Sequence, residues 1–233
     1  MKINVSVIIP AFNESENLIS LIDKILKQKY LFDNMEIILV DDFSNDNTHK
    51  VIEKYKNKGD IIYLQNLTRS GQSMSISNGI KKSKYENIIT LDGDGQNDPD
   101  DFSLLLNNYK SNKYYLISGI RKIRKDNFVK KISSKIANYV RSLILNDKCE
   151  DSACGLKIFS KAIFLKIKFF DGMHRFLPAL FIAYGVKPVY VSINHKSRLK
   201  GKSKYGILDR LFRGIFDLYK VKKMINEIKS KKC

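Results

Sequence analysis

Two aspartates one residue apart have the clearest chemical potential in this sequence. Asp92 and Asp94 flank a glycine directly after residues 85–91, whose β-branched side chains predict a buried strand. Ligands of open α/β sheets bind outside the carboxyl ends of the strands. Adjacent carboxylates repel each other unless a cation lies between them, and hard oxygen ligands suit Mg²⁺ or Mn²⁺. The pair therefore predicts a metal site that holds a diphosphate, although an isolated Asp-Gly-Asp is more commonly a surface turn.

The segments before this pair alternate between strands and helices. Buried, β-branched patterns predict strands at 3–9, 36–40, 61–64 and 85–91, with a helix after each of the first three. Asn13 is the expected cap of the first helix. Such alternation with short connections predicts an α/β fold, a mostly parallel sheet with helices on both faces.

Acidic residues follow three of these strands. Residues 13–14, 41–42 and 92–94 each come directly after a strand, so they should gather along one edge of the sheet. One acidic loop is commonly a solvated turn, but three converging loops in a basic chain indicate a site. The sequence contains no Gly-x-Gly-x-x-Gly or Walker A loop, which argues against dinucleotide binding and nucleoside-triphosphatase activity.

The charge of the chain points to an anionic partner. The 233 residues include 42 Lys and Arg against 24 Asp and Glu, which gives a net charge of +18. Such an excess favours nucleic acid, anionic lipid head groups or phosphorylated substrates. Nucleic acid is the weakest of these alternatives, because the basic residues are spread along the chain and the sequence has no aromatic RNA-binding motif.

Cysteine content and hydropathy indicate a reducing compartment and no membrane span. The three cysteines lack C-x-x-C spacing, which argues against a disulfide framework and a zinc site. The longest nearly apolar stretch, 176–186, contains Pro178, whereas a spanning helix needs about 20 apolar residues. We therefore expect a cytoplasmic protein that does not cross a membrane by itself.

A basic segment from 126 to 145 has helical spacing. Val140 and Leu143 belong to its apolar face, while Arg141 and several lysines lie on the other faces, which we expect to be solvated. The start of this helix would help to position an anionic acceptor.

The C-terminal segment, 206–233, is predicted to be a separate basic amphipathic helix. Its apolar stripe includes Leu218 and Tyr219, a pattern that suits either a membrane interface or packing on the core. Lys222 and Lys223 would swing toward the apolar side, where burial is costly but a head-group boundary lets them snorkel. We therefore expect this helix to lie in a membrane interface.

The order of the motifs resembles that of family 2 inverting glycosyltransferases of GT-A fold, in particular the polyprenyl-phosphate branch that includes dolichol-phosphate mannose synthase. The matching segments are Val7–Glu14, Glu36–Ser44, Arg69–Gln72, Asp92–Gln96, Asp151–Lys157, Met173–Leu180 and His195–Tyr205. The resemblance implies a GT-A, Rossmann-like catalytic domain over 1–205. It also implies sugar transfer from a UDP- or GDP-sugar to a polyprenyl (dolichyl or undecaprenyl) phosphate.

The resemblance further implies a role for each matching residue. Those expected to line the nucleotide pocket are Pro10, Ala11, Asn13, Glu14, Asp41, Asp42, Arg69, Gly71 and Asp92. Asp94 and Gln96, together with Asp92, would ligate Mg²⁺ or Mn²⁺. Those expected to hold the acceptor phosphate or the donor diphosphate are Arg121, Lys131, Arg198, Lys202 and Ser203.

The chemistry of a phosphate acceptor agrees with these residues. A phosphate is already ionised near neutral pH, so it needs no strong base, and a cation with nearby Arg and Lys would stabilise the leaving nucleoside diphosphate. A sugar hydroxyl of a cell-surface polysaccharide or lipid would instead need a carboxylate base, for which Asp151 is the candidate. A cap or turn role for Asp151 is an equally good interpretation. His174 could touch the acceptor, but a histidine beside an apolar segment is more commonly structural.

Many members of the resembling family continue into transmembrane helices after the closing basic motif, whereas this sequence ends at residue 233. We therefore expect peripheral association with the inner face of the cell membrane, and a small membrane protein is a candidate partner.

Overall fold

The computed structural model describes residues 2–55, 60–109, 114–121, 138–194, 196 and 207–230, with the side chains of the last range described at 214 and 216–230. Its centre is a seven-stranded sheet in the order β3-β2-β1-β4-β6-β5-β7. The strands are β1 (Asn4–Ala11), β2 (Asn34–Asp41), β3 (Ile61–Gln65), β4 (Asn87–Thr90), β5 (Leu116–Arg121), β6 (Lys157–Ser160) and β7 (Val189–Ile193).

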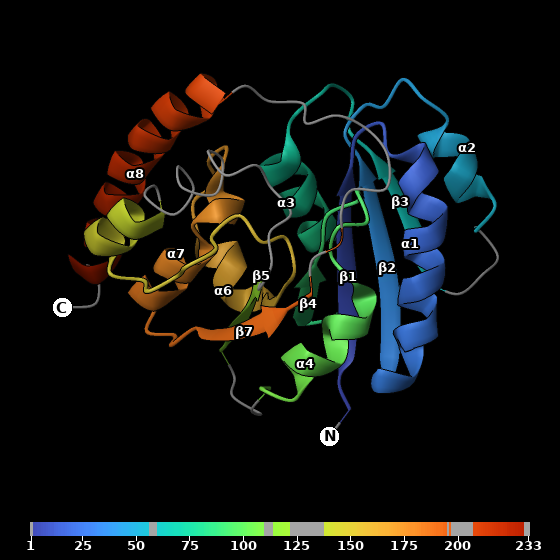
Figure 1. Cartoon of the computed structure of the whole chain (residues 1–233), viewed down its shortest axis with the longest axis horizontal. Coiled ribbons are helices and arrows are strands. Elements are labelled where there is room, and N and C mark those ends of the chain that lie inside the picture. The colour runs from blue at the N-terminus through green and yellow to red at the C-terminus, as the bar shows by residue number, and fades with distance from the viewer. Residues whose placement is uncertain are drawn as a thin grey trace.

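Helices connect and cover these strands (Figure 1). The α-helices are α1 (Ser15–Lys27), α2 (Thr48–Glu53), α3 (Gln72–Lys82), α4 (Phe102–Leu106), α6 (Lys161–Lys166), α7 (Leu177–Ala183) and α8 (Ile207–Ser230). The 3₁₀ turns are η1 (Gln28–Leu31), η2 (Pro99–Asp101) and η3 (Met173–Arg175). Residues 138–145 are also helical.

The strand pairing confirms the predicted α/β class. β1 pairs in parallel with β2 and β4, β2 with β3, and β5 with β7, while β6 runs antiparallel to β4 and β5. The four strands predicted from sequence are all present, with ends within two residues of those expected. The sheet is therefore mostly parallel, as predicted.

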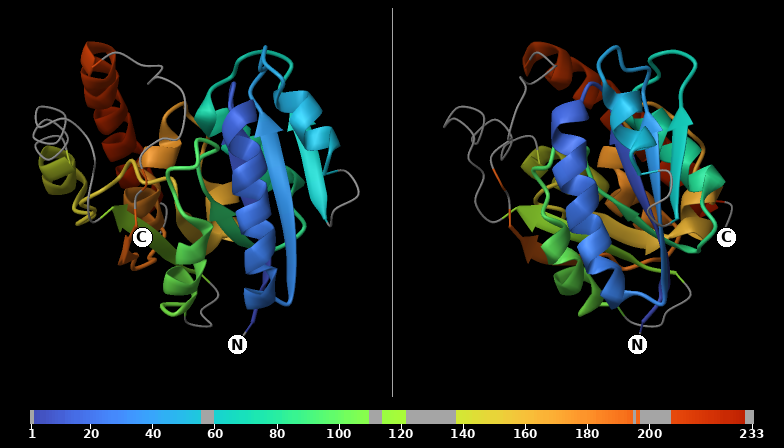
Figure 2. Two further views of the ribbon diagram at one scale, coloured as in Figure 1. Left: turned by 45° about the vertical axis from the view of Figure 1, so that its right-hand side comes forward. Right: turned by 90° about the vertical axis from the view of Figure 1, so that its right-hand side faces the viewer.

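Alternating side chains of the central strands build two cores, one on each face of the sheet. Val7 and Ile9 of β1 belong to the core beneath α1, α2 and α4, whereas Ile8 belongs to the core beneath α3, α6, α7 and α8. Successive strand residues point to opposite faces, so a run of apolar residues in β1 serves both cores. Figure 2 shows the resulting three-layer arrangement.

The C-terminal helix packs one of its faces on the protein core. Val221 and Ile225 are buried in the second core, and Asp217 forms an ion pair of 2.7 Å with Arg175 of η3. Tyr219 and Lys222 are exposed. The helix therefore buries the face centred on Val221, and its location in a membrane interface stays a prediction. The division of the chain at residue 205 stays a prediction.

The described part of the 126–145 segment also differs from the expectation. Arg141 is buried, whereas Val140 and Leu143 are exposed, which reverses the predicted orientation. Arg141 has an internal partner, because Asp147 lies 2.6 Å from its guanidinium and offsets part of the desolvation cost of burying the charge.

The described helices offer no membrane span. None of them combines the length and the hydropathy that crossing a bilayer requires.

Candidate active site

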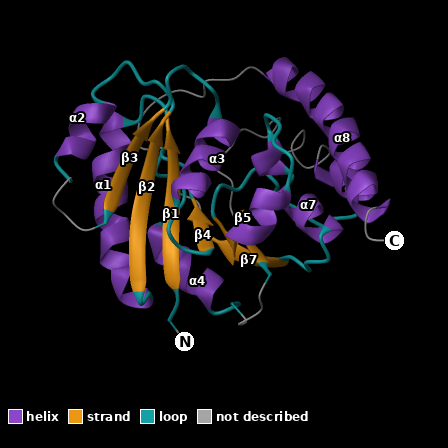
Figure 3. Cartoon of the chain, turned by 180° about the vertical axis from the view of Figure 1, so that it is seen from behind, coloured by secondary structure: helices purple, strands orange, loops and turns teal. Residues whose placement is uncertain are grey.

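The loops that follow β1, β2 and β4 meet, as the acidic motifs predicted. Figure 3 shows β1 and β2 ending side by side at one edge of the sheet. The Asp42 amide donates to the Ala11 carbonyl at 2.8 Å and joins the first two loops. The third loop approaches through Gly93, where an added Cβ would lie 3.1 Å from the Pro10 carbonyl oxygen. Only glycine allows this approach without a shift of the backbone.

Asn13 links two of the loops and does not cap α1, which corrects the sequence prediction. Its amide donates to Ser44 Oγ at 2.9 Å, and its side-chain oxygen accepts the Asn45 amide at 3.0 Å. The cap position is Glu14, which makes no side-chain cap hydrogen bond. Asn13 has a φ of 53°, a left-handed conformation that asparagine tolerates better than most residues.

Asp41 is buried and fixes the second loop. Its two oxygens accept the Ser44 amide at 2.9 Å and the Tyr63 hydroxyl at 2.8 Å. Burial, together with this bond to Asp41, raises the pKa of Tyr63 above its ordinary value. A direct contact between Asp41 and a nucleotide therefore stays a prediction, since the carboxylate already has protein partners.

Asp42 holds the Arg69–Gln72 segment in place. Its oxygens accept the amides of Ser70 at 2.7 Å and Gly71 at 2.9 Å, and Gly71 has a φ of 84°. Arg69 stacks over the Phe12 ring at 4.2 Å and so joins this loop to the first. The predicted nucleotide-binding residues thus belong to one connected set of loops, although their contacts with a nucleotide stay predictions.

Asp92 lies among polar groups at the centre of the site. Gln72 Nε2 donates to its Oδ1 at 2.7 Å, and a Cβ at Gly155 would lie only 2.5 Å from the carboxylate. Burial and the nearby Asp94 raise the pKa of Asp92 to about 6, against the opposing charges of Lys157 and Arg121. The carboxylate is therefore held between a like charge and two cations.

Asp94 and Gln96 supply the remaining ligands that the resemblance implies for a cation. Asp94 is buried and accepts the Gln96 amide at 3.1 Å. The described residues contain no cluster of three or more His, Cys, Asp or Glu that could enclose a metal. Mg²⁺ is commonly bound by one or two carboxylates and completed by substrate phosphates. The mutual repulsion of Asp92 and Asp94 fits such an incomplete site.

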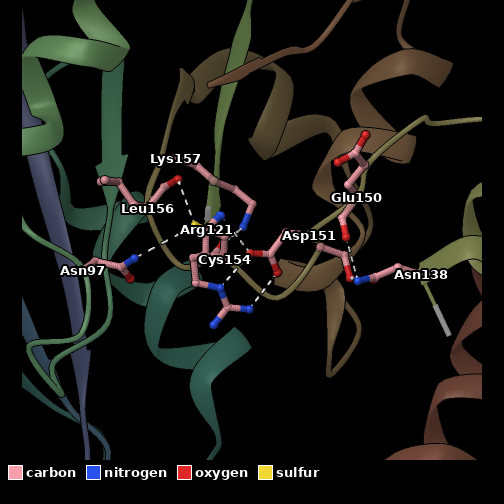
Figure 4. Close-up of polar contacts among 9 residues, drawn as sticks. Asn97, Arg121, Asn138, Glu150, Asp151, Cys154, Leu156 and Lys157 are labelled. Carbon is pink, nitrogen blue, oxygen red and sulfur yellow. Dashed lines mark hydrogen bonds and ion pairs between the residues drawn. The ribbon is translucent and has the colours of Figure 1, made fainter. Parts of the chain in front are cut away.

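Arg121 and Lys157 form the cationic side of the site (Figure 4). Asp151 accepts from Nε and Nη2 of Arg121, both at 2.6 Å, so an anion would have to meet the Nη1 end. Burial by itself would lower the pKa of Arg121. The hydrogen bonds and the charge of Asp151 outweigh this effect, so the pKa lies above its ordinary value. Lys157 is buried and donates to the Cys154 carbonyl. The ion pair argues against Asp151 as a free base.

His174 is neutral and has a structural partner. Its Nδ1 lies 2.7 Å from Ser73 Oγ, which also accepts the Gly172 amide at 2.9 Å. Burial, with the charges of Arg175 and Lys157, lowers the pKa of His174 to about 3. This environment favours the structural interpretation of the histidine.

The segment before the closing basic motif is anchored beside the loop that carries Asp94 and Gln96. The Lys196 amide donates to the Gln96 carbonyl at 3.0 Å, and its side chain pairs with Asp98. Asp101 accepts two bonds from Asn194, at 2.8 and 2.9 Å. Four residues given a role from the resemblance lie outside the described residues, namely Lys131, Arg198, Lys202 and Ser203, as does the whole His195–Tyr205 motif except Lys196.

Sequence reasoning gave no role to Lys157, Tyr63 or Ser73. Lys157 belongs to a motif, but its place opposite Thr90 in the β4–β6 pair is what brings it to the site. A contact between Tyr63 and Asp41 could have been predicted from the strand order. β3 pairs with β2, so side chains near the end of β3 can reach Asp41 at the end of β2.

A family comparison agrees with this geometry. The model of glycosyl transferase family 2 matches residues 6–168, which include all three loops. The chain belongs to glycosyl transferase family 2. The match covers well over half of the sequence and ends beyond β6, so it contains the acidic pair and Lys157.

Two curated relatives are similar over most of the chain. Dodecaprenyl-phosphate galacturonate synthase of Rhizobium johnstonii is 36% identical over 227 residues, 94% of this chain and 66% of the relative. Undecaprenyl-phosphate 4-deoxy-4-formamido-L-arabinose transferase of Proteus mirabilis is 31% identical over 221 residues, 93% of this chain and 67% of the relative. The chain therefore spans about two thirds of the length of these relatives.

Solved structures share the fold. Glucosyl-3-phosphoglycerate synthase from Mycobacterium tuberculosis, in complex with Mn²⁺, UDP-glucose and phosphoglyceric acid, has a TM-score of 0.69 at 15% identity, covering 94% of this chain and 80% of its own. Mannosyl-3-phosphoglycerate synthase from Rubrobacter xylanophilus has a TM-score of 0.65 at 13% identity. The match covers 98% of this chain and 73% of the synthase. At this identity the similarity supports the GT-A fold and nothing finer.

Proposed function

We propose that this chain transfers a sugar from a nucleotide sugar to a polyprenyl phosphate with the help of Mg²⁺ or Mn²⁺. The observation that carries the proposal is the pair Asp92 and Asp94 at the edge of the sheet, with Arg121 and Lys157 close to Asp92. Two carboxylates suit a cation on the donor diphosphate, and the buried Lys157 with the half-buried Arg121 suits further negative charge.

The residues present account for the charge changes of the reaction. An acceptor phosphate oxygen forms a bond to the anomeric carbon, and the bond to the nucleoside diphosphate breaks with its electron pair on the leaving group. A divalent ion on Asp94, Gln96 and Asp92 would neutralise the charge of that leaving group. Arg121 and Lys157 supply positive potential beside Asp92, and Arg121 is oriented for this task by Asp151.

A phosphate acceptor fits better than a sugar hydroxyl. The hydroxyl would need a free carboxylate base, and Asp151 is buried with both oxygens on Arg121. The relatives named for dodecaprenyl and undecaprenyl phosphate support the same acceptor. Lys131, Arg198, Lys202 and Ser203 complete the acceptor and diphosphate site in this proposal.

The proposed donor is a UDP- or GDP-sugar and the proposed location is the inner face of the cell membrane. The Mn²⁺ and UDP-glucose in the structural neighbour make UDP-sugars with Mn²⁺ the first donors to test. A small membrane-protein partner is also part of the proposal, and co-purification from solubilised membranes would reveal it.

The decisive experiment measures transfer of labelled sugar into a butanol-extractable product. The protein is incubated in detergent with polyprenyl phosphate, a panel of UDP- and GDP-sugars, and Mg²⁺ or Mn²⁺. We expect product that is lost on chelation and in Asp94→Asn, whereas Asp100→Asn, an exposed aspartate outside the pair, retains it. Activity that survives both chelation and Asp94→Asn would refute the metal assignment.

A further inference from the structure

One nitrogen of the His174 ring is held by a buried serine. Nδ1 of His174 lies 2.7 Å from Ser73 Oγ, and this oxygen also accepts the Gly172 amide at 2.9 Å. Ser73 is fully buried in the first turn of α3, so solvent does not reach its hydroxyl group. The hydrogen bonds of this group must therefore be made within the protein.

The hydrogen bonds of Ser73 determine which nitrogen of His174 carries the proton. A hydroxyl group has one proton to donate, and that of Ser73 already accepts the Gly172 amide. Among the described residues, His174 Nδ1 is the one partner left to accept the Ser73 proton. If Nδ1 donated instead, the Ser73 proton would be buried without an acceptor, which costs free energy. Ser73 therefore donates to Nδ1, and the neutral His174 ring carries its proton on Nε2.

The Nε2–H group of His174 is open to a ligand. The described residues offer it no hydrogen-bond partner, and it is not among their fully enclosed unpaired polar atoms. The His174 side chain is half-buried, so part of its ring stays accessible. Burial and the charges of Arg175 and Lys157 lower the pKa of His174 to about 3, so the ring is uncharged near neutral pH. Nε2 is thus a neutral donor whose orientation is set by Ser73.

The turn that carries His174 lies beside Asp92. η3 packs on α3, whose first residue, Gln72, donates to the Asp92 carboxylate at 2.7 Å. The next residue of α3 is Ser73, so adjacent side chains hold Asp92 and His174. The charge of Lys157 acts on both groups, because it lowers the pKa of each. Asp92 and His174 therefore lie close together at the start of α3.

We propose that His174 donates a hydrogen bond from Nε2 to an oxygen of the sugar that is transferred. This inference rests on the proposed function, in which Asp92 and Asp94 hold the donor diphosphate and the sugar extends beyond it. A neutral N–H group suits a sugar hydroxyl, whereas the charged Arg121 and Lys157 suit phosphate. A sugar that lacks the matching oxygen is rejected, because the N–H group would be left unpaired.

His174 is then a determinant of sugar specificity and neither an acid nor a base. Its structural role and its sugar contact are compatible, because they use different ring nitrogens. Ser73 takes Nδ1 and the sugar takes Nε2.

Two substitutions of His174 separate the sugar contact from the bond to Ser73. The amide of asparagine reaches the place of Nδ1, whereas that of the longer glutamine reaches the place of Nε2. His174→Asn should keep the Ser73 bond and lose the sugar contact, so kcat/KM for sugar transfer should fall about tenfold. His174→Gln should lose the Ser73 bond but still offer a donor to the sugar, so its kcat/KM should fall much less. A histidine that acts only through Ser73 predicts the reverse order.

Binding measurements identify the part of the substrate that His174 contacts. The probes are the UDP- and GDP-sugars of the transfer panel, with UDP and GDP as the matching ligands without a sugar. His174→Asn should weaken Mg²⁺-dependent binding of the sugar nucleotide that is transferred and leave binding of its free nucleoside diphosphate unchanged. A change confined to KM for polyprenyl phosphate would overturn the proposal, because His174 would then contact the acceptor.

Nitrogen NMR tests the position of the proton without any substrate. The chain has three histidines, so the signals that disappear in His174→Asn are those of His174. We expect the proton on Nε2 in the wild type, and Ser73→Ala should release this preference because it removes the donor to Nδ1. A wild-type proton on Nδ1 would overturn the proposal, as would activity in His174→Asn that equals or exceeds that in His174→Gln. An Nε2 proton without transfer from any donor would refute the proposed function and leave the orientation of His174 standing.

Discussion

A methyl group at Gly155 should disable the site through Asp92. A Cβ at this position would lie 2.5 Å from Cγ, Oδ1 and Oδ2 of Asp92, whereas ordinary contact begins at 3.4 Å. The Asp92 carboxylate must therefore retreat by about 0.9 Å in Gly155→Ala, a distance that strains its hydrogen bond with Gln72. A displacement of about 1 Å at a reacting site costs on the order of 100-fold in rate.

The expected loss corresponds to an increase of about 2.7 kcal/mol in the activation free energy. It is measured as kcat/KM for sugar transfer, together with the Mn²⁺-dependent affinity for the nucleoside diphosphate. Gly214→Ala is the neutral control, because nothing lies within 4 Å of the added methyl. Gly79→Ala is the packing control, since its Cβ would lie 2.6 Å from Ile8 Cγ2 and should lower the free energy of unfolding. If Gly155→Ala keeps wild-type kcat/KM and nucleotide affinity, Asp92 does not act where we place it.

Three further substitutions test other parts of the site. Asp151→Asn leaves the half-buried Arg121 without its ion pair and should lower the free energy of unfolding in urea by about 3 kcal/mol, and an unchanged value would contradict the pairing. The pKa of His174 is lowered to about 3 in the folded protein, whereas the unfolded chain has the ordinary histidine pKa of 6.5. The unfolded state therefore binds a proton first, and the free energy of unfolding should fall as the pH drops below about 6.5. At about pH 5 the loss should reach 1–2 kcal/mol, and His174→Gln should abolish this part of the pH dependence. Asp101 holds Asn194, the residue just before the closing basic motif, so we infer that it positions this motif. Asp101→Asn should therefore raise KM for the donor more than it changes kcat, and equal effects on both would contradict this role.

The sequence alone determined the first half of the sheet and the position of the acidic loops. Buried strands are rich in β-branched residues, and side chains that follow parallel strands must meet at one edge. These local rules suffice for 13–14, 41–42 and 92–94, whose convergence the structure confirms. The order of the motifs also indicated the family, because the motifs follow one another along this chain in the same order as in family 2 glycosyltransferases.

Only the tertiary structure decided which side of each amphipathic helix meets the core. Helical spacing shows which residues share a face, but the partner of that face comes from distant parts of the chain. Arg141 is buried beside Asp147, with which it forms an ion pair. In α8, Val221 packs in the second core, so Phe216 and Tyr219 on the opposite side are exposed. The same limit applies to Lys157, whose place beside Asp92 follows from strand pairing between β4 and β6. Side-chain periodicity is a local property, whereas burial and charge pairing depend on long-range contacts that a linear pattern does not contain.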